Sequence, residues 1–199
     1  MIRRPLRAAA CALVLVGLGP LVTGCQGDVS GTATSAPTPA AEETSAAAEL
    51  RPGMDVPPPT GRVVLTIRGS DVTNVGDELR LDLAQLESMG TTTLEADDTE
   101  ATGRRTSFSG PLVRTVLDVA GADQATNLHV VALNDYEVDV PVSDARDLPL
   151  MLATRADGQP MSVANYGPTR FVYPTEGYDL PRSTYAPRWI WQLKEIWVE

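Results

Sequence analysis

Alternating apolar and polar side chains first appear at residues 63–69, where Val63, Leu65 and Ile67 occupy every second position. A period of two places these side chains on one face of a strand, toward a core, and leaves the other face for polar residues. Similar stretches, separated by turns that contain Asn, Asp, Gly or Pro, predict four further strands, at 128–133, 136–142, 148–154 and 169–173.

The tryptophan-rich segment 188–199 predicts a last strand. A bulge near Glu195 would bring all of its main apolar side chains to one face. These side chains are Trp189, Trp191, Leu193, Ile196 and Val198. Tryptophans at alternate positions of a terminal strand usually pack a core, and the other interpretation of Trp189, Trp191 and Trp197 is a stacking platform for a ligand.

Two short helices are predicted between the strands. In the first, at 81–90, Asp82 is suited to cap the N-terminus with Gln85 three residues later, and Gly90 is suited to end it. The second covers 110–121, and a polar loop at 91–107 separates the two. Two helices among six or more strands indicate an α+β domain with a mixed or antiparallel sheet.

Residues 1–24 have the pattern of a bacterial lipoprotein signal peptide. Three arginines lie within the first seven residues, an apolar stretch follows at 8–22, and the sequence LVTGC then places Cys25 as the lipidation site. We therefore expect an extracytoplasmic protein that is lipid-anchored to the cell membrane through Cys25. The alternatives are a plain signal peptide with an incidental cysteine, and a twin-arginine signal at RRPLR, residues 3–7, that exports folded proteins.

Residues 25–60 are rich in Ser, Thr, Ala and Pro and have almost no large apolar side chain before Leu50. Such a segment buries too little surface to offset its ordering entropy, so we expect a disordered tether. The folded domain is then expected at 61–199.

Charge and composition exclude several classes of function. The 199 residues have a net charge of −10, which disfavours nucleic acid as a partner because phosphate binding needs a basic surface. Cys11, Cys25 and His129 are the only cysteines and histidine, so a Cys/His zinc site is not available, and G-x-S-x-G, G-x-G-x-x-G and P-loop motifs are absent. His129 fits a strand pattern and is assigned no catalytic role.

From residue 61 onward, the order of the motifs resembles the oxidoreductase molybdopterin-binding domain, the fold of sulfite oxidases and their bacterial relatives. The pieces that carry this resemblance are LTIRGSDV, FSGPLVRTVLDVAG, NDYEVDVPVSDA, Asp157-Gly158, ANYGPTRFVYP and WIWQLKEIWV. The resemblance implies a molybdenum held by a pterin dithiolene and one protein cysteine, with oxygen-atom transfer or reductase chemistry.

The chain departs from the family at the metal ligand. The resemblance places that cysteine in the loop 91–107, which contains none. A thiolate donates charge to the metal in a way that Asp97, Asp98 or Thr99 does not match. We expect the acidic residues here to form a solvated loop, with Arg104 and Arg105 neutralising them.

The resemblance also implies two cofactor contacts, at Asn165 and Arg170. An arginine fork binds phosphate oxygens in pairs, which suits a pterin phosphate. The other interpretation is that Asn165 shapes the turn at Gly167-Pro168 and that Arg170 pairs with a carboxylate.

Three functions remain open at this point. The preferred one is a non-catalytic binding or interaction module of the cell envelope, with no metal or cofactor, whose partner is an unknown envelope protein or small ligand. The second is a molybdopterin-dependent oxidoreductase in which molybdenum has a non-Cys ligand or the dithiolene alone. The third is a structural envelope lipoprotein without a ligand.

Overall fold

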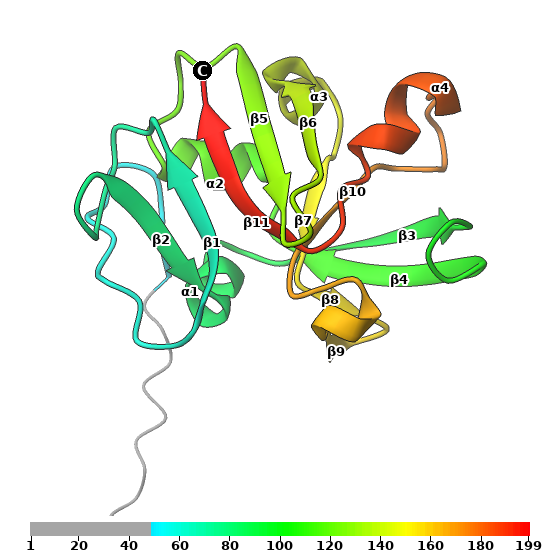
Figure 1. The fold of residues 1–199 in the computed structure, drawn as a ribbon, viewed down its shortest axis with the longest axis horizontal. Helices are drawn as coiled ribbons and strands as arrows, with labels where there is room; N and C mark the ends of the chain where they lie inside the picture. The colour runs from blue at the N-terminus through cyan, green and yellow to red at the C-terminus, as the bar shows by residue number, and fades with distance from the viewer. Residues whose placement is uncertain (1–48) are drawn as a thin grey trace, which may run out of the picture. The chain divides into compact units, whose positions relative to one another are not determined.

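The computed structural model describes residues 49–199, and its largest sheet has five strands in the order β2-β1-β11-β5-β6 (Figure 1). These strands are β2 (Glu78–Asp82), β1 (Val63–Arg68), β11 (Leu193–Val198), β5 (Asn127–Ala132) and β6 (Glu137–Pro141). β1 and β11 are parallel and the other neighbours are antiparallel, so the sheet is mixed. The α+β class predicted from the sequence is confirmed.

Two smaller sheets complete the fold. The four-stranded sheet consists of β3 (Thr92–Asp98), β4 (Arg104–Gly110), β8 (Arg155–Ala156) and β9 (Gln159–Pro160), and the two-stranded sheet of β7 (Met151–Ala153) and β10 (Arg170–Val172). The prediction of a loop at 91–107 is therefore wrong. Its residues form a β3–β4 hairpin with Thr92 opposite Gly110 and Asp98 opposite Arg104.

The helices are short and more numerous than predicted. They are α1 (Leu83–Ser88), α2 (Val113–Val119), α3 (Val142–Asp147) and α4 (Arg182–Tyr185), with 3-10 turns η1 (Val163–Asn165) and η2 (Ala186–Arg188). The predicted start of α1 is confirmed, since Asp82 and Gln85 form a reciprocal capping box. Neither α3 nor α4 was predicted, because neither is long enough to show a helical period in the sequence. Within residues 49–199, no helix has the length and apolarity to span a membrane.

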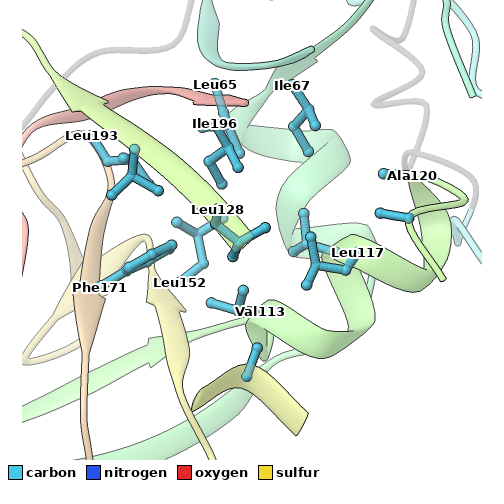
Figure 2. Packing of buried hydrophobic residues seen from close by; sticks show 14 of the residues in the cluster. Leu65, Ile67, Val113, Leu117, Ala120, Leu128, Leu152, Phe171, Leu193 and Ile196 are labelled. Carbon is cyan, nitrogen blue, oxygen red and sulfur yellow. The ribbon is translucent and has the colours of Figure 1, made fainter. Parts of the chain in front are cut away.

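The main core lies between α2 and the five-stranded sheet. Figure 2 shows Val113 and Leu117 of α2 near Leu128 of β5 and Leu152 of β7, with Leu65 and Ile67 of β1 close to Ile196 of β11; all are buried. A second buried cluster lies at the hairpin and consists of Ala96, Phe108, Met151, Ala153, Met161 and Val172.

Two side chains from the segment assigned to the tether belong to the main core. Leu50 and Val56 are 4% and 5% exposed, and the carbonyl of Pro57 accepts hydrogen bonds from the side-chain amides of Gln85 and Asn74. The ordered part thus begins before residue 61. The predicted signal peptide at 1–24 and the predicted tether up to residue 48 lie outside the described residues.

The last strand is shorter than predicted and has the predicted bulge. β11 begins at Leu193, and its pairing with β5 shifts register between Leu193 and Glu195. Trp189 and Trp191 precede the strand and are half-buried, whereas Trp197 is 43% exposed with the Arg68 guanidinium 5.0 Å from its ring centre. The expectation of core packing fails for Trp197 and holds only in part for Trp189, which contacts both clusters.

Candidate functional site

Arg170 and Asp98 form a buried ion pair where β10 meets β3. Their side chains are 1% and 2% exposed, with Arg170 Nη2 2.9 Å from Asp98 Oδ1 and Nη1 3.2 Å from Oδ2. Burial lowers the pKa of Arg170 because it penalises the charged form, and the bonds to Asp98 oppose that shift. Both terminal nitrogens of the Arg170 guanidinium are therefore bonded to Asp98. These are the nitrogens that would otherwise bind an anion.

Aromatic rings surround this guanidinium. The centre of the Arg170 guanidinium lies 5.0 Å from the ring of Phe108, 5.6 Å from Trp191, 5.8 Å from Trp189 and 5.9 Å from Tyr166. Arg170 Nε is also buried and makes no hydrogen bond with any residue of the described range 49–199. The charge of Arg170 therefore lies in an apolar setting, and Asp98 is the residue of the described range that neutralises it directly.

The alternation of β3 explains how Asp98 reaches this position. Leu94, Ala96 and Asp98 share the inner face of the strand, while Glu95 and Asp97 lie on the exposed face. The expectation of a solvated acidic loop is thus wrong for Asp98, although Asp97 and Thr99 are exposed. The signal was present in the sequence, as a period of two from residue 94 onward.

The two predicted cofactor contacts lie in different environments. Asn165 is exposed at the end of η1, where its backbone N–H and that of Gly167 donate to the carbonyl of Ser162. Arg170 is buried and paired with Asp98, as in the second interpretation of this residue. Neither residue is among those that line the cleft described next.

A cleft lined by the half-buried Trp189 and Trp191 consists of two adjoining hollows. The first has a volume of about 170 Å³ and is bounded by the hairpin end and the α4 region, which lie one above the other in Figure 1. The second, of about 440 Å³, extends toward β5 and Tyr136. Four residues line both hollows, namely Glu100, Ala186, Trp189 and Trp191.

A buried hydrogen-bond network fixes the far wall of the first hollow. The Tyr173 hydroxyl donates to Asp144 Oδ2 over 2.8 Å, and Arg188 Nη1 donates to the same oxygen over 2.8 Å. Burial, more than the nearby Asp144 charge, raises the pKa of Tyr173, so its proton stays in place. Tyr185 packs edge-on against Tyr173 at 5.2 Å between ring centres, which holds two aromatic rings in the lining.

Charges at the cleft are mostly negative. Asp97 and Glu100 line the first hollow together with Arg182, whose guanidinium forms an exposed ion pair with Glu100 at 2.5 Å. Arg104 and Arg105 lie opposite Asp98 and Asp97 in the hairpin register, as the predicted neutralisation requires, but their direct ion pairs are with other carboxylates. Arg104 pairs with Asp157, and Arg105 pairs with Glu176 and Glu95.

No metal centre is evident among residues 49–199, since they contain no group of three or more His, Cys, Asp or Glu side chains arranged to hold an ion. His129 pairs with Asp139 and Glu137 on the sheet, away from the residues that line the cleft.

Comparison with known proteins identifies the family. The sequence profile of the oxidoreductase molybdopterin binding domain matches residues 57–198, and a search of curated proteins finds no match. A similar solved structure is that of the sulfane dehydrogenase SoxCD from Paracoccus pantotrophus, with a TM-score of 0.50 and 19% identity over 67% of this chain. The match covers 37% of that protein's chain, so this chain spans well under half its length, and the likeness shows a shared fold. On the match over 57–198, this chain belongs to the oxidoreductase molybdopterin binding domain family.

Proposed function

We propose that this protein is a lipid-anchored component of the cell envelope whose molybdopterin-binding-type domain is a non-catalytic binding module. The observation that carries this proposal is the Asp98–Arg170 pair. Arg170 is the residue best suited to hold a pterin phosphate, and its charge is already neutralised by a buried carboxylate of the same chain.

The residues present do not fit a molybdenum–pterin group. The domain has no cysteine to supply a thiolate, and the cleft presents the carboxylates of Asp97 and Glu100 where an anionic cofactor needs cations. Arg182, the guanidinium at this cleft, is paired with Glu100. Freeing Arg170 for a phosphate would leave Asp98 buried without a partner, which is strongly unfavourable.

A second candidate is an oxidoreductase in which molybdenum is held without a cysteine. The family match favours it, as does the position of Asp97 and Thr99 at the cleft, on the segment where the family's metal ligand is expected. The third candidate, a structural lipoprotein without a ligand, makes no use of the cleft.

Metal and pterin analysis of the protein from its native host distinguishes the first two candidates. We expect molybdenum and pterin far below one equivalent per chain. A molybdenum enzyme purified from the same cells serves as the loading control. One equivalent of both, lost on Asp97→Ala, would overturn the non-catalytic assignment and favour the second candidate.

The lipid anchor has its own test. Support for it comes from the signal-like start and the LVTGC sequence, which lie outside the described residues. We expect Cys25→Ala to move the protein from the membrane fraction to the soluble fraction without changing its thermal unfolding. Cys11→Ala is the matched control and should leave the membrane fraction unchanged. Persistent membrane association of Cys25→Ala would exclude lipidation as the anchor.

A further inference from the structure

We propose that the cleft binds a small organic cation, an ammonium group that carries small alkyl groups. This inference rests on the proposed function, because a cleft without a cofactor is free for another ligand. It combines three properties of the cleft: aromatic walls, a carboxylate that makes no direct ion pair and a fixed geometry.

Aromatic side chains line both hollows. Trp189 and Trp191 lie between the two hollows, and Tyr173, Tyr178 and Tyr185 line the first. The face of an aromatic ring carries negative charge density, so such walls attract a cation while their carbon atoms contact its alkyl groups. The Tyr173 network and the edge-on contact with Tyr185 keep the walls in place before a ligand arrives.

The charge balance favours a cation over an anion or a neutral ligand. Asp97 forms no ion pair within 4 Å among residues 49–199, since the nearby Arg105 is bound to Glu95 and Glu176. Arg182 compensates only Glu100. One carboxylate at the first hollow thus has no direct ion pair, although Arg105 lies opposite it in the β3–β4 register, in a chain whose net charge is −10.

The size of the site fits a small molecule. The two hollows measure about 170 and 440 Å³ and adjoin at the tryptophans. Sites for small organic ligands typically span roughly 300 to 1,000 Å³. We infer that the ammonium group occupies the first hollow, beside Asp97, with its alkyl groups against Trp189 and Trp191.

The test compares choline with its uncharged carbon analogue, 3,3-dimethyl-1-butanol, by ligand titration followed by indole fluorescence and NMR. Both molecules have the same shape, so only the charge differs. We expect choline to bind at least about tenfold more tightly than the alcohol. The affinity for choline should fall as the salt concentration rises. Equal affinities, or no saturable binding of choline, would overturn the proposal.

Three single substitutions locate the site. Asp97→Asn should weaken choline binding about fivefold to tenfold, and Arg182→Gln should strengthen it by about twofold to fivefold because Glu100 loses its competing cation. Arg104→Gln is the matched control for charge. Arg104 is exposed on the β3–β4 hairpin, as Asp97 is, but does not line the cleft. Equal effects of Arg182→Gln and Arg104→Gln would show a non-specific charge effect and contradict the site.

Failure of this inference is distinct from failure of the proposed function. Absence of choline binding in protein that lacks molybdenum and pterin would overturn only the cation site. Molybdenum and pterin at one equivalent would overturn the non-catalytic assignment, whatever the choline titration shows.

Discussion

Asp97 and Asp98 are neighbours in the chain with opposite environments. The carboxylate of Asp98 is buried and satisfied by Arg170, whereas Asp97 points from the exposed face of β3 toward the cleft. Removing one partner of a buried ion pair leaves the other charge unsolvated and unpaired, which is far more costly than removing an exposed charge. The same substitution should therefore have very different effects at the two positions.

We expect Asp98→Asn to lower the free energy of unfolding by about 3 kcal/mol or more, and Asp97→Asn to change it by less than about 0.5 kcal/mol. Urea denaturation measures both. The double variant Asp98→Leu/Arg170→Met removes both charges and should recover most of the loss. Equal stabilities of the two single variants would contradict the role of the pair.

At the residue scale, pairing of Arg170 with a carboxylate could be predicted from the sequence, but the identity of that carboxylate could not. Asp98 belongs to a segment whose Thr, Asp and Gly content indicates a loop, and that composition concealed a period of two at Leu94, Ala96 and Asp98. The resemblance directed attention to Asn165 and Arg170 as a pair, yet Arg170 is buried and Asn165 is exposed, and the burial of Arg170 depends on contacts between segments far apart in sequence. A pattern within one segment does not contain that information.

At the scale of elements, the junction between the hairpin and the main core depends on Gly110. A Cβ atom there would lie 2.2 Å from the carbonyl oxygen of Leu152, because the segments around 109–113 and 150–154 exchange backbone hydrogen bonds. We expect Gly110→Ala to cost about 2 to 3 kcal/mol of stability by forcing these segments apart. Ser109→Ala, one residue earlier, is the control, and thermal unfolding of both variants tests the difference.

The β5–β6 pair contains a titratable contact at the single histidine. His129 Nδ1 lies 2.9 Å from Asp139 Oδ1, with Glu137 3.4 Å from Nε2, and this hydrogen bond to Asp139 raises the pKa of His129 above its usual value. A pKa that is higher in the folded than in the unfolded state stabilises the protein below the unfolded pKa, near 6.5, and that gain disappears as pH rises through the folded pKa.

We expect stability to fall by less than about 1 kcal/mol between pH 6 and pH 8, because the contact is partly exposed. His129→Gln should remove this pH dependence. Denaturant midpoints measured across the range provide the test, and a variant that keeps the wild-type slope would exclude His129 as its source.

Strong local signals predicted elements well. The capping residues of α1 and the alternation of β1, β5 and β6 lie within one short window each. By contrast, α3 and α4 are one to two turns long, and β2 ends at Asp82, the N-cap of α1, so neither a helical nor a strand period develops fully. Such elements form because packing of the whole domain stabilises them.

At the scale of the molecule, the domain extends beyond the boundary at residue 61. A chain beginning at residue 61 lacks the buried side chains of Leu50 and Val56, each worth about 1.5 to 3 kcal/mol. We expect it to be less stable than a chain beginning at residue 49 by about 3 kcal/mol or more. Leu50→Ala and Val56→Ala in the full chain should each reproduce part of that loss.

The parallel pairing of β1 with β11 sets the order in which the domain acquires its structure. Ile67 lies opposite Ile196, and β11 occupies the centre of the five-stranded sheet. Bringing β1 and β11 together closes the long segment of chain between them, which is entropically costly. Topologies dominated by such distant contacts fold slowly. Because β11 pairs with both β1 and β5, the five-stranded sheet cannot be complete before residues 193–198 are available to join them.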